Sequence, residues 1–502
     1  MRDDGSNGDA VAGDGIYSAR MPGRAAGSQV AFTVTASDRD PSPASSVFPA
    51  PLVFPAASVQ EALVRWGETK PFGNLGVYRL WQRQRDYDSL RNREPLANDP
   101  LDCTFVYGDE RVVYNAEMRA KGSPWHGGSV GGDYVFSMPE DDRVLGARDI
   151  AVVTLGNLGS DPSAQREQAA FWIGRQMGIA TLHRRHVHFF ENGGFKGLYE
   201  DTEEPNGLYV DRWFPDGQDG DLFKIEDWFE FNDAGNSFVF ARDATLERFT
   251  TLGGGLKQAR YRWAWRKRAV ARSANDYRAF LQLVDTVANA SANTAPRIEG
   301  FVDIENWMRT FALQHIVGNW DAYGHSRGKN SYLYLPTGGR WKIIPWDIDF
   351  VLGSSSDGPT ADVFGSVDPV VSRLWNVPPF RRAYWRAFQD AVDGPLAPEN
   401  IDRLLDARYA ALVANGFTVE NPSAIKTFVR QRREYLASRV ASEDTSALVI
   451  TNNNGADFST ATPFVTLAGR APIDLATLLV NGVRYPVTWT SVTGWTLSIA
   501  LG

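Results

Sequence analysis

Short stretches in which hydrophobic and polar residues alternate are the main pattern in the first two hundred positions. Residues 29–36, for example, alternate with a period of two, which is typical of half-buried β-strands. Asp161 and Pro162 suit the cap and the first turn of one helix, whose apolar face ends at Gly178. The other strands predicted in this part are 103–107, 112–118, 133–138, 151–155, 186–190 and 197–200.

Helical periodicity takes over after about residue 207. The predicted helices are 207–214, 259–272, 275–289, 303–317, 379–392 and 424–439. A β-hairpin, 331–335 with 341–344, is expected between the last long helices. Short strands with turn residues return after residue 440. The pattern therefore predicts an α+β fold with a strand-rich first half and a mostly helical second half.

The changes of pattern divide the chain into three parts. Residues 1–45 are expected to be the C-terminal part of an immunoglobulin- or fibronectin-like β-domain, ending in a Pro/Ser/Ala linker at 40–46. Residues 56–440 form the body, and 445–502 are expected to begin another immunoglobulin-like domain. Both flanks are predicted to be partial β-sandwiches.

Composition limits the classes of partner. The net charge is −8 and the isoelectric point about 5.4, which argues against nucleic-acid binding and favours a basic protein partner. No apolar run reaches the length of a membrane span. Cys103 is the only cysteine, which excludes an intrachain disulfide and a cysteine-based metal site. The first residues lack the basic and apolar segments of a signal peptide, so none is expected in this fragment.

The densest group of reactive residues lies between 315 and 353. Transfer of a phosphoryl group from ATP requires a carboxylate near the acceptor hydroxyl, together with an Asn and an Asp that hold Mg²⁺. Asp321, Asn330 and one of Asp347 and Asp349 supply these groups in the order that kinases use. The predicted hairpin between Asn330 and Asp347 would bring these distant positions together.

Several segments of the body resemble one family in sequence and order. They are Met118-Arg-Ala-Lys121-Gly122-Ser123, Asp161-Pro-Ser-Ala-Gln-Arg166-Glu167, Asn192-Gly-Gly-Phe-Lys-Gly197-Leu-Tyr199, Leu222-Phe-Lys224, Asn319-Trp-Asp321, Asn330-Ser-Tyr-Leu-Tyr334, Gly339-Arg-Trp341 and Pro345-Trp-Asp347-Ile-Asp349. In this pattern the chain resembles the CotH (spore coat protein H-type) atypical protein kinases over about 56–440. The resemblance implies a bilobal kinase-like fold and an ATP- and Mg²⁺-dependent kinase acting on Ser or Thr of a protein.

The resemblance also implies roles for the metal and catalytic residues. Asp321 would be the catalytic carboxylate and Asn330 a Mg²⁺ ligand. Of the two acidic residues that follow the hairpin, Asp349 is favoured over Asp347, because Ile-Asp-Phe parallels the Asp-Phe-Gly segment of ordinary kinases. The alternative interpretation is that Asp347 only hydrogen-bonds the turn.

Nucleotide contacts are expected from several places. Lys121, Gly122 and Ser123 begin a glycine-rich run whose backbone N–H groups would cradle phosphates, although such a run also suits a simple hairpin. Glu167 would pair with a lysine, as the αC glutamate of kinases does, and Glu204 would lie in the inter-lobe hinge. The strand at 150–156 has no lysine, so the ATP lysine is expected to be Lys121 or Lys224.

Other interpretations remain open. The same scaffold suits an enzyme that transfers AMP, or a surface or adhesion protein without catalysis. Asp321 and Asn330 are nine positions apart, so 322–329 must bulge, and no compact Gly-x-Gly-x-x-Gly motif is present. His183, His186 and His188 suggest a zinc site, but side chains that line a strand are the simpler interpretation. The basic run 257–272 suggests binding of an acidic polymer, but a solvated helix is the simpler interpretation. The family implies a secreted or cell-surface protein, with a monomeric kinase unit inside a longer chain.

Overall fold

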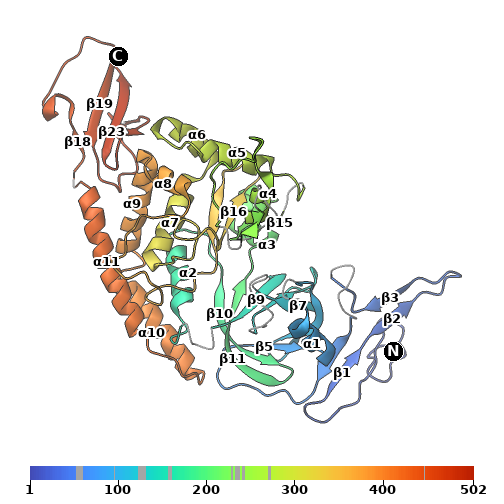
Figure 1. Ribbon diagram of the computed structural model, residues 1–502. Coiled ribbons are helices and arrows are strands. Elements are labelled where there is room, and N and C mark those ends of the chain that lie inside the picture. The colour runs from blue at the N-terminus through green and yellow to red at the C-terminus, as the bar shows by residue number, and fades with distance from the viewer. Residues whose placement is uncertain are drawn as a thin grey trace. The chain divides into compact units, whose positions relative to one another are not determined.

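The computed structural model describes residues 1–52, 60–94, 97–121, 132–155, 161–227, 230–231, 238–239, 243–269, 273–445 and 447–501 (Figure 1). It contains both helices and β-sheets, which confirms the predicted α+β class. The chain divides into two compact units. Unit 1 contains Met1–Thr154 and His186–Asp201, and unit 2 contains Leu155–Arg185 and Thr202–Gly502.

Seven strands of unit 1 form a closed barrel in the order β10-β11-β9-β8-β7-β6-β5. The strands are β5 (Gly76–Trp81), β6 (Leu101–Tyr107), β7 (Arg111–Ala120), β8 (Tyr134–Ser137), β9 (Asp149–Thr154), β10 (Arg184–Glu191) and β11 (Gly194–Glu203). Parallel pairing of β10 with β5 closes the barrel, and Phe105, Phe136 and Phe189 are fully buried in its core. The sequence predicted most of these strands but not the closed barrel, because closure depends on this pairing between segments far apart in the chain.

The N-terminal strands form two antiparallel pairs. One joins β1 (Gln29–Phe32) to β4 (Ala62–Arg65), and the other joins β2 (Val34–Ser37) to β3 (Ser45–Phe48). The linker predicted at 40–46 therefore overlaps the β2–β3 connection. Helix α1 (Gln84–Asn92), which the sequence analysis did not predict, follows β5.

Unit 2 is built on a four-stranded sheet in the order β15-β12-β16-β17. Its strands are β12 (Asp221–Ile225), β15 (Trp265–Ala269), β16 (Ser331–Leu335) and β17 (Lys342–Pro345). The short strands β13 (Glu230–Phe231) and β14 (Phe238–Val239) pair separately. Helix α7 (Ile304–Val317) has eleven buried residues, and eight of them, Trp307 and Phe311 included, belong to the main core.

Helices make up most of the remainder of unit 2. They are α2 (Arg166–Gln176), α3 (Gly207–Trp213), α4 (Gln258–Ala264), α5 (Arg278–Val287), α6 (Ala295–Phe301), α7, α8 (Pro369–Trp375), α9 (Pro378–Asp393), α10 (Pro398–Ala414) and α11 (Ser423–Glu443), with 3-10 turns at Pro215–Gly217, Ala292–Thr294 and Asn452–Gly455. The helix predicted at 259–272 is wrong over 265–269, where the chain forms β15, and 270–272 lie outside the described residues. Trp265 is fully buried there, and the pairing of β15 with β12 outweighs the helical pattern of the basic run.

The C-terminal strands form a small sheet within unit 2. The strands here are β18 (Val449–Ile450), β19 (Phe464–Arg470), β20 (Leu479–Val480), β21 (Val483–Arg484), β22 (Thr488–Trp489) and β23 (Gly494–Ala500). The order in the sheet is β18-β19-β23-β22, and β20 and β21 form a separate hairpin. Arg382 of α9 donates to the carbonyl oxygens of Val492 and Leu475, at 2.7 and 3.2 Å, and lies 3.6 Å over the Trp489 ring. The small sheet is therefore joined to the helices through a buried guanidinium. Its immunoglobulin-like character stays a prediction.

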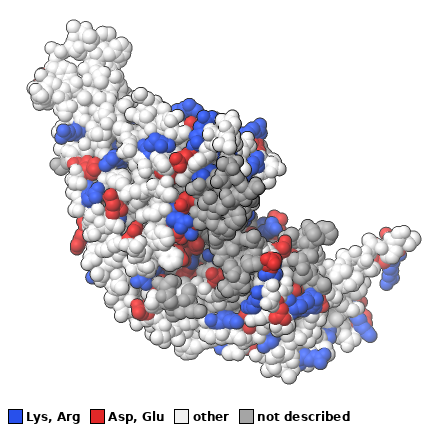
Figure 2. All heavy atoms as spheres, viewed as in Figure 1, with Lys and Arg blue, Asp and Glu red and all other residues white. Residues whose placement is uncertain are grey.

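Among the described residues, no helix is both long and apolar enough to cross a bilayer. On the face in Figure 2, basic and acidic side chains are interspersed over the helices, whereas the C-terminal sheet carries few charges.

Candidate functional site

Antiparallel pairing brings three distant segments to one end of the sheet in unit 2. The last residue of β12, the first of β16 and the last of β17 are register partners: Ile225, Ser331 and Pro345. Asp227, Asn330 and Asp347 lie just beyond these three positions. The backbone N–H of Trp346 also donates to the Asn330 carbonyl at 3.1 Å. The predicted hairpin is confirmed, and it places the candidate site residues at the same edge.

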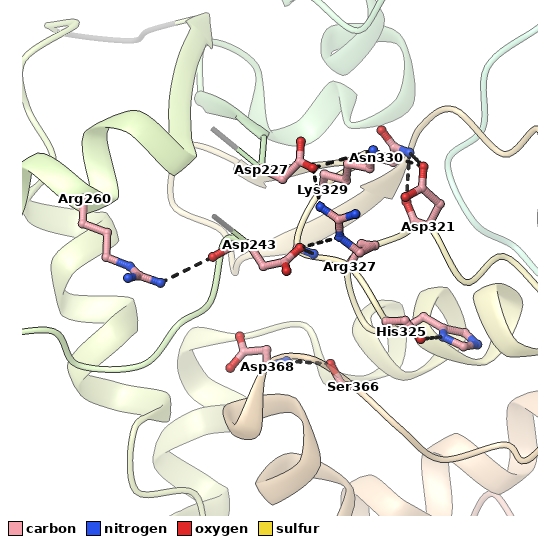
Figure 3. A network of polar contacts seen from close by, with 12 residues as sticks. Asp227, Asp243, Arg260, Asp321, His325, Arg327, Lys329, Asn330, Ser366 and Asp368 are labelled. Carbon is pink, nitrogen blue, oxygen red and sulfur yellow. Dashed lines mark hydrogen bonds and ion pairs between the residues drawn. The ribbon is translucent and has the colours of Figure 1, made fainter. Parts of the chain in front are cut away.

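Asp321 lies at this edge in a polar cluster (Figure 3). It is only 6% exposed, and its Oδ2 accepts from Asn330 Nδ2 at 3.1 Å and lies 3.2 Å from Lys329 Nζ. Asn330 Nδ2 also donates to the Asp321 carbonyl oxygen at 2.8 Å. The other carboxylate oxygen, Oδ1, is buried and receives no hydrogen bond from the described residues. Oδ2 is thus held in place by Asn330 and Lys329, while Oδ1 can still accept a hydrogen bond.

The pKa of Asp321 reflects competing influences. Burial raises the pKa above its ordinary value, the cations of Lys329 and Arg327 lower it, and the Asp347 carboxylate raises it again. The negative charge of Asp347 is therefore close enough to influence the pKa of Asp321. Among the neighbouring groups, Lys329 does most to lower the pKa of this buried carboxyl.

A second pair of carboxylates holds the cations of the cluster. Arg327 bridges Asp227 at 2.6 Å and Asp243 at 2.9 Å, and Lys329 Nζ lies 3.7 Å from Asp227 (Figure 3). Burial raises the pKa of Asp227. The sequence analysis assigned no role to any of these four residues. Asp227 was the one with a usable signal, because it lies three positions after the family-like segment Leu222-Phe-Lys224.

The loop 322–329 takes up the nine-residue spacing between Asp321 and Asn330. It is closed by a hydrogen bond from Tyr323 N to Lys329 O at 2.7 Å. Gly328 N donates to Asp243 Oδ1 at 2.7 Å, and a Cβ at Gly328 would lie 2.3 Å from the backbone nitrogen of Ala244. The predicted bulge therefore exists and needs glycine where it packs against the neighbouring backbone.

Buried side chains also anchor the loop 322–329. The Tyr323 hydroxyl donates to Asp368 at 2.7 Å, and His325 lies 2.8 Å from Asp357. The His325 ring stacks on His315 with centroids 4.2 Å apart, and burial lowers the pKa of His315 well below its ordinary value. These contacts fix the position of the backbone that carries Lys329.

The segment after β17 has unusual backbone geometry. Asp347 has a φ of +53° and Asn330 a φ of +55°, both in the left-handed region that non-glycine residues seldom adopt. Such residues concentrate at functional sites, where the surroundings hold them in place. Asp347 and Asp349 are both half-buried. Phe350, by contrast, is 37% exposed, with its ring centroid 6.3 Å from that of Trp320.

Glu167 of α2 contacts this segment. Its Oε1 accepts from the backbone N–H of Ile348 at 3.1 Å, and its Oε2 pairs with Arg184 at 2.6 Å. The sequence analysis expected Glu167 to pair with a lysine, and this described partner is an arginine. The helix that carries Glu167 is nevertheless linked directly to the backbone between Asp347 and Asp349.

Of the remaining predicted residues, the structure describes Lys121, Lys224 and Glu204. Lys121 follows β7 in unit 1, and Gly122 and Ser123 lie outside the described residues. Lys224 on β12 pairs with Glu226 at 2.7 Å, next to the cluster's edge of the sheet. Glu204 is half-buried directly after β11.

Two of the three histidines lie near different glutamates. His183 lies 3.4 Å from Glu203, whereas His186 lies 3.5 Å from Glu200. His188 is buried, and burial lowers its pKa. This arrangement fits side chains of a strand wall better than a zinc site.

Comparison with known proteins gives one match. The model of a family described as CotH kinase protein matches residues 138–437, more than half of the chain. The match includes Glu167, Asp321, Asn330 and Asp347 and excludes Lys121. A search of curated proteins found no match.

Proposed function

Because the chain belongs to the CotH kinase protein family, we propose that it is an atypical protein kinase that transfers the γ-phosphoryl group of ATP to a Ser or Thr hydroxyl. The observation that carries this proposal is the buried Oδ1 of Asp321, which receives no hydrogen bond from the described residues. A buried acceptor costs free energy when it has no donor, and a donor that arrives with the substrate would satisfy it. The acceptor hydroxyl is that donor.

Asp321 would orient the acceptor hydroxyl and take its proton. Its raised pKa suits this role, because a carboxylate with a pKa nearer to neutrality is a better general base than an exposed one. Asn330 Nδ2 and Lys329 Nζ hold Oδ2 and so aim Oδ1 at the hydroxyl. Lys329 and Arg327 add positive charge where the negative charge of the transferred group accumulates.

The donor set fits Mg²⁺, which prefers carboxylate and amide oxygens. Asn330 Nδ2 is engaged with Asp321, so the amide oxygen, the atom that binds a cation, faces away from that carboxylate. We propose Asn330 and Asp347 as ligands, because each lies within two residues of the register partners Ser331 and Pro345, with Asp349 as a further candidate. When bound, Mg²⁺ would hold ATP and neutralise the charge of its phosphates.

The acceptor proposed is a Ser- and Thr-rich protein. The net charge of −8 favours a partner of basic character. We further propose that the protein acts outside the cell or at its surface. A single, buried cysteine is compatible with an oxidising environment.

Calorimetric titration with ATP, with and without Mg²⁺, tests the binding part of the proposal. The double variant Asp347→Asn with Asp349→Asn should bind Mg²⁺-ATP at least tenfold more weakly than the wild type, because a hydrogen bond or ligand contact to a charged group contributes roughly 1.5–3 kcal/mol. Its affinity for metal-free ATP should change far less. Asp393→Asn, on an exposed helix end, is the matched control. If the double variant binds Mg²⁺-ATP and metal-free ATP as the wild type does, the segment 347–349 has a structural role only. A wild type that binds no nucleotide would favour a non-catalytic protein.

A further inference from the structure

A cavity in unit 2 has a strongly basic lining and lies outside the candidate site. Its volume is about 250 Å³, and α2, residues 182–185 and Arg408 of α10 line it. Its basic lining residues are Arg175, His183, Arg184, Arg185 and Arg408, and none of the described lining residues is acidic. A lining with four guanidinium groups and no carboxylate among its described residues favours an anion over a cation or a neutral ligand.

Two of the arginines are oriented before any ligand arrives. Arg184 has a side chain only 5% exposed and pairs with Glu167 at 2.6 Å. Arg175 is directed by weak hydrogen bonds to Thr181 Oγ1 at 3.3 Å and Leu182 O at 3.4 Å. Guanidinium groups whose orientation is already fixed lose less conformational entropy when they bind an anion.

The cavity also has an apolar side. Phe171, Trp172 and Leu182 contribute to the lining, and the Arg184 guanidinium lies 5.4 Å from the centroid of the Phe171 ring. Planar guanidinium forks match phosphate oxygens, and an apolar wall suits the carbon stem of an ester. We propose that this cavity binds a phosphate monoester, such as a phosphoserine or phosphothreonine side chain.

Glu167 links this cavity to the candidate site. It neutralises Arg184 on one side and accepts from Ile348 N on the other. An anion in the cavity competes with Glu167 for Arg184 and thereby acts on the segment that carries Asp347. This regulatory consequence rests on the proposed function, whereas the binding itself does not.

Calorimetric titration of the full chain with a phosphoserine peptide tests the inference. The same peptide without phosphate and inorganic phosphate are the companion probes. The wild type should bind the phosphopeptide and not the unmodified peptide. The variant Arg185→Gln with Arg408→Gln should bind about tenfold or more weakly, because each lost contact to a charged group costs at least that factor. Arg403→Gln, which removes an exposed arginine from the same helix, is the matched control and should bind like the wild type.

Two further variants keep the result interpretable. Arg408→Lys retains the charge but loses the planar fork, so its affinity should fall between those of wild type and Arg408→Gln. Glu167→Gln releases Arg184 to the ligand and should strengthen phosphate binding several-fold. Tighter binding of the phosphopeptide than of phosphate identifies a phosphorylated protein segment as the source, and equal binding identifies free phosphate. Absence of phosphate binding by the wild type, or unchanged binding by the folded double variant, would overturn the proposal without bearing on the kinase assignment.

Discussion

Replacing Lys329 by methionine is expected to raise the pKa of Asp321 and to shift the acid limb of the kinase's pH profile to higher pH. Lys329 Nζ lies 3.2 Å from Asp321 Oδ2, and it is the main cation that opposes the effect of burial on this carboxyl. Methionine keeps the length and the apolar stem of the side chain but removes the charge. The variant therefore isolates the electrostatic contribution of Lys329.

The magnitude follows from the environment of the pair. Two unit charges about 4 Å apart attract by about 4 kcal/mol at an effective dielectric constant of 20, and by about 1 kcal/mol in water. The side chains of Lys329 and Asp321 are 23% and 9% exposed, which places the pair between these limits. At about 1.4 kcal/mol per pKa unit, the loss of the cation should raise the pKa of Asp321 by about one to three units.

The assay is the pH dependence of kcat/KM for phosphoryl transfer, which reports ionisations of the free enzyme. Asp321 must be ionised to accept a proton, so activity falls as pH drops through its pKa. In Lys329→Met this fall should begin about one to three pH units higher than in the wild type. Lys426→Met, which breaks a surface ion pair with Asp406, should leave the profile unchanged. An acid limb that stays in place in Lys329→Met would refute the idea that Lys329 tunes Asp321, even if the maximal rate fell.

Three further predictions concern stability. Gly328→Ala should lower the free energy of unfolding by about 1–3 kcal/mol in urea, because its Cβ would overlap the backbone of Ala244, whereas Gly358→Ala, with open space around it, should have little effect. Burial raises the pKa of Asp102 from an ordinary 3.8 to about 8, so ionisation opposes folding and wild-type stability falls as pH rises through this range. Between pH 6 and 8 the wild type should therefore lose ~2 kcal/mol relative to Asp102→Asn, and parallel curves would refute this. Arg382→Gln should make the C-terminal sheet more sensitive to limited proteolysis, because three backbone carbonyls lose their donor, and an unchanged digestion pattern would contradict this.

The centre of the candidate site was predictable because its residues border a local structure. The alternation within 331–335 and 341–344 predicts a hairpin, and a hairpin necessarily brings the residues before and after it together. This is why Asn330 and Asp347 were expected near each other. The spacing of Asp321 and Asn330 likewise predicted the bulge of 322–329.

Other parts depend on long-range contacts that leave no periodic signal. The barrel closes through Val187 paired with Gly76, positions that nothing in the local sequence connects. Residues 265–269 continue the pattern of α4, yet they form a strand because β12 offers them a partner. Asp243 and Arg327 look like ordinary surface charges until the fold brings them together.

Transfer of phosphate itself tests the central claim most directly. The wild type and Asp321→Ala should each be incubated with Mg²⁺-ATP and a serine-rich basic protein, and the acceptor weighed by mass spectrometry. We expect additions of about 80 Da per phosphoryl group with the wild type and none with Asp321→Ala, whose affinity for ATP should stay within a few-fold of the wild-type value. Equal phosphorylation by the variant would remove Asp321 from the catalytic role. Additions of about 329 Da would show transfer of AMP instead of phosphate and contradict the proposed reaction.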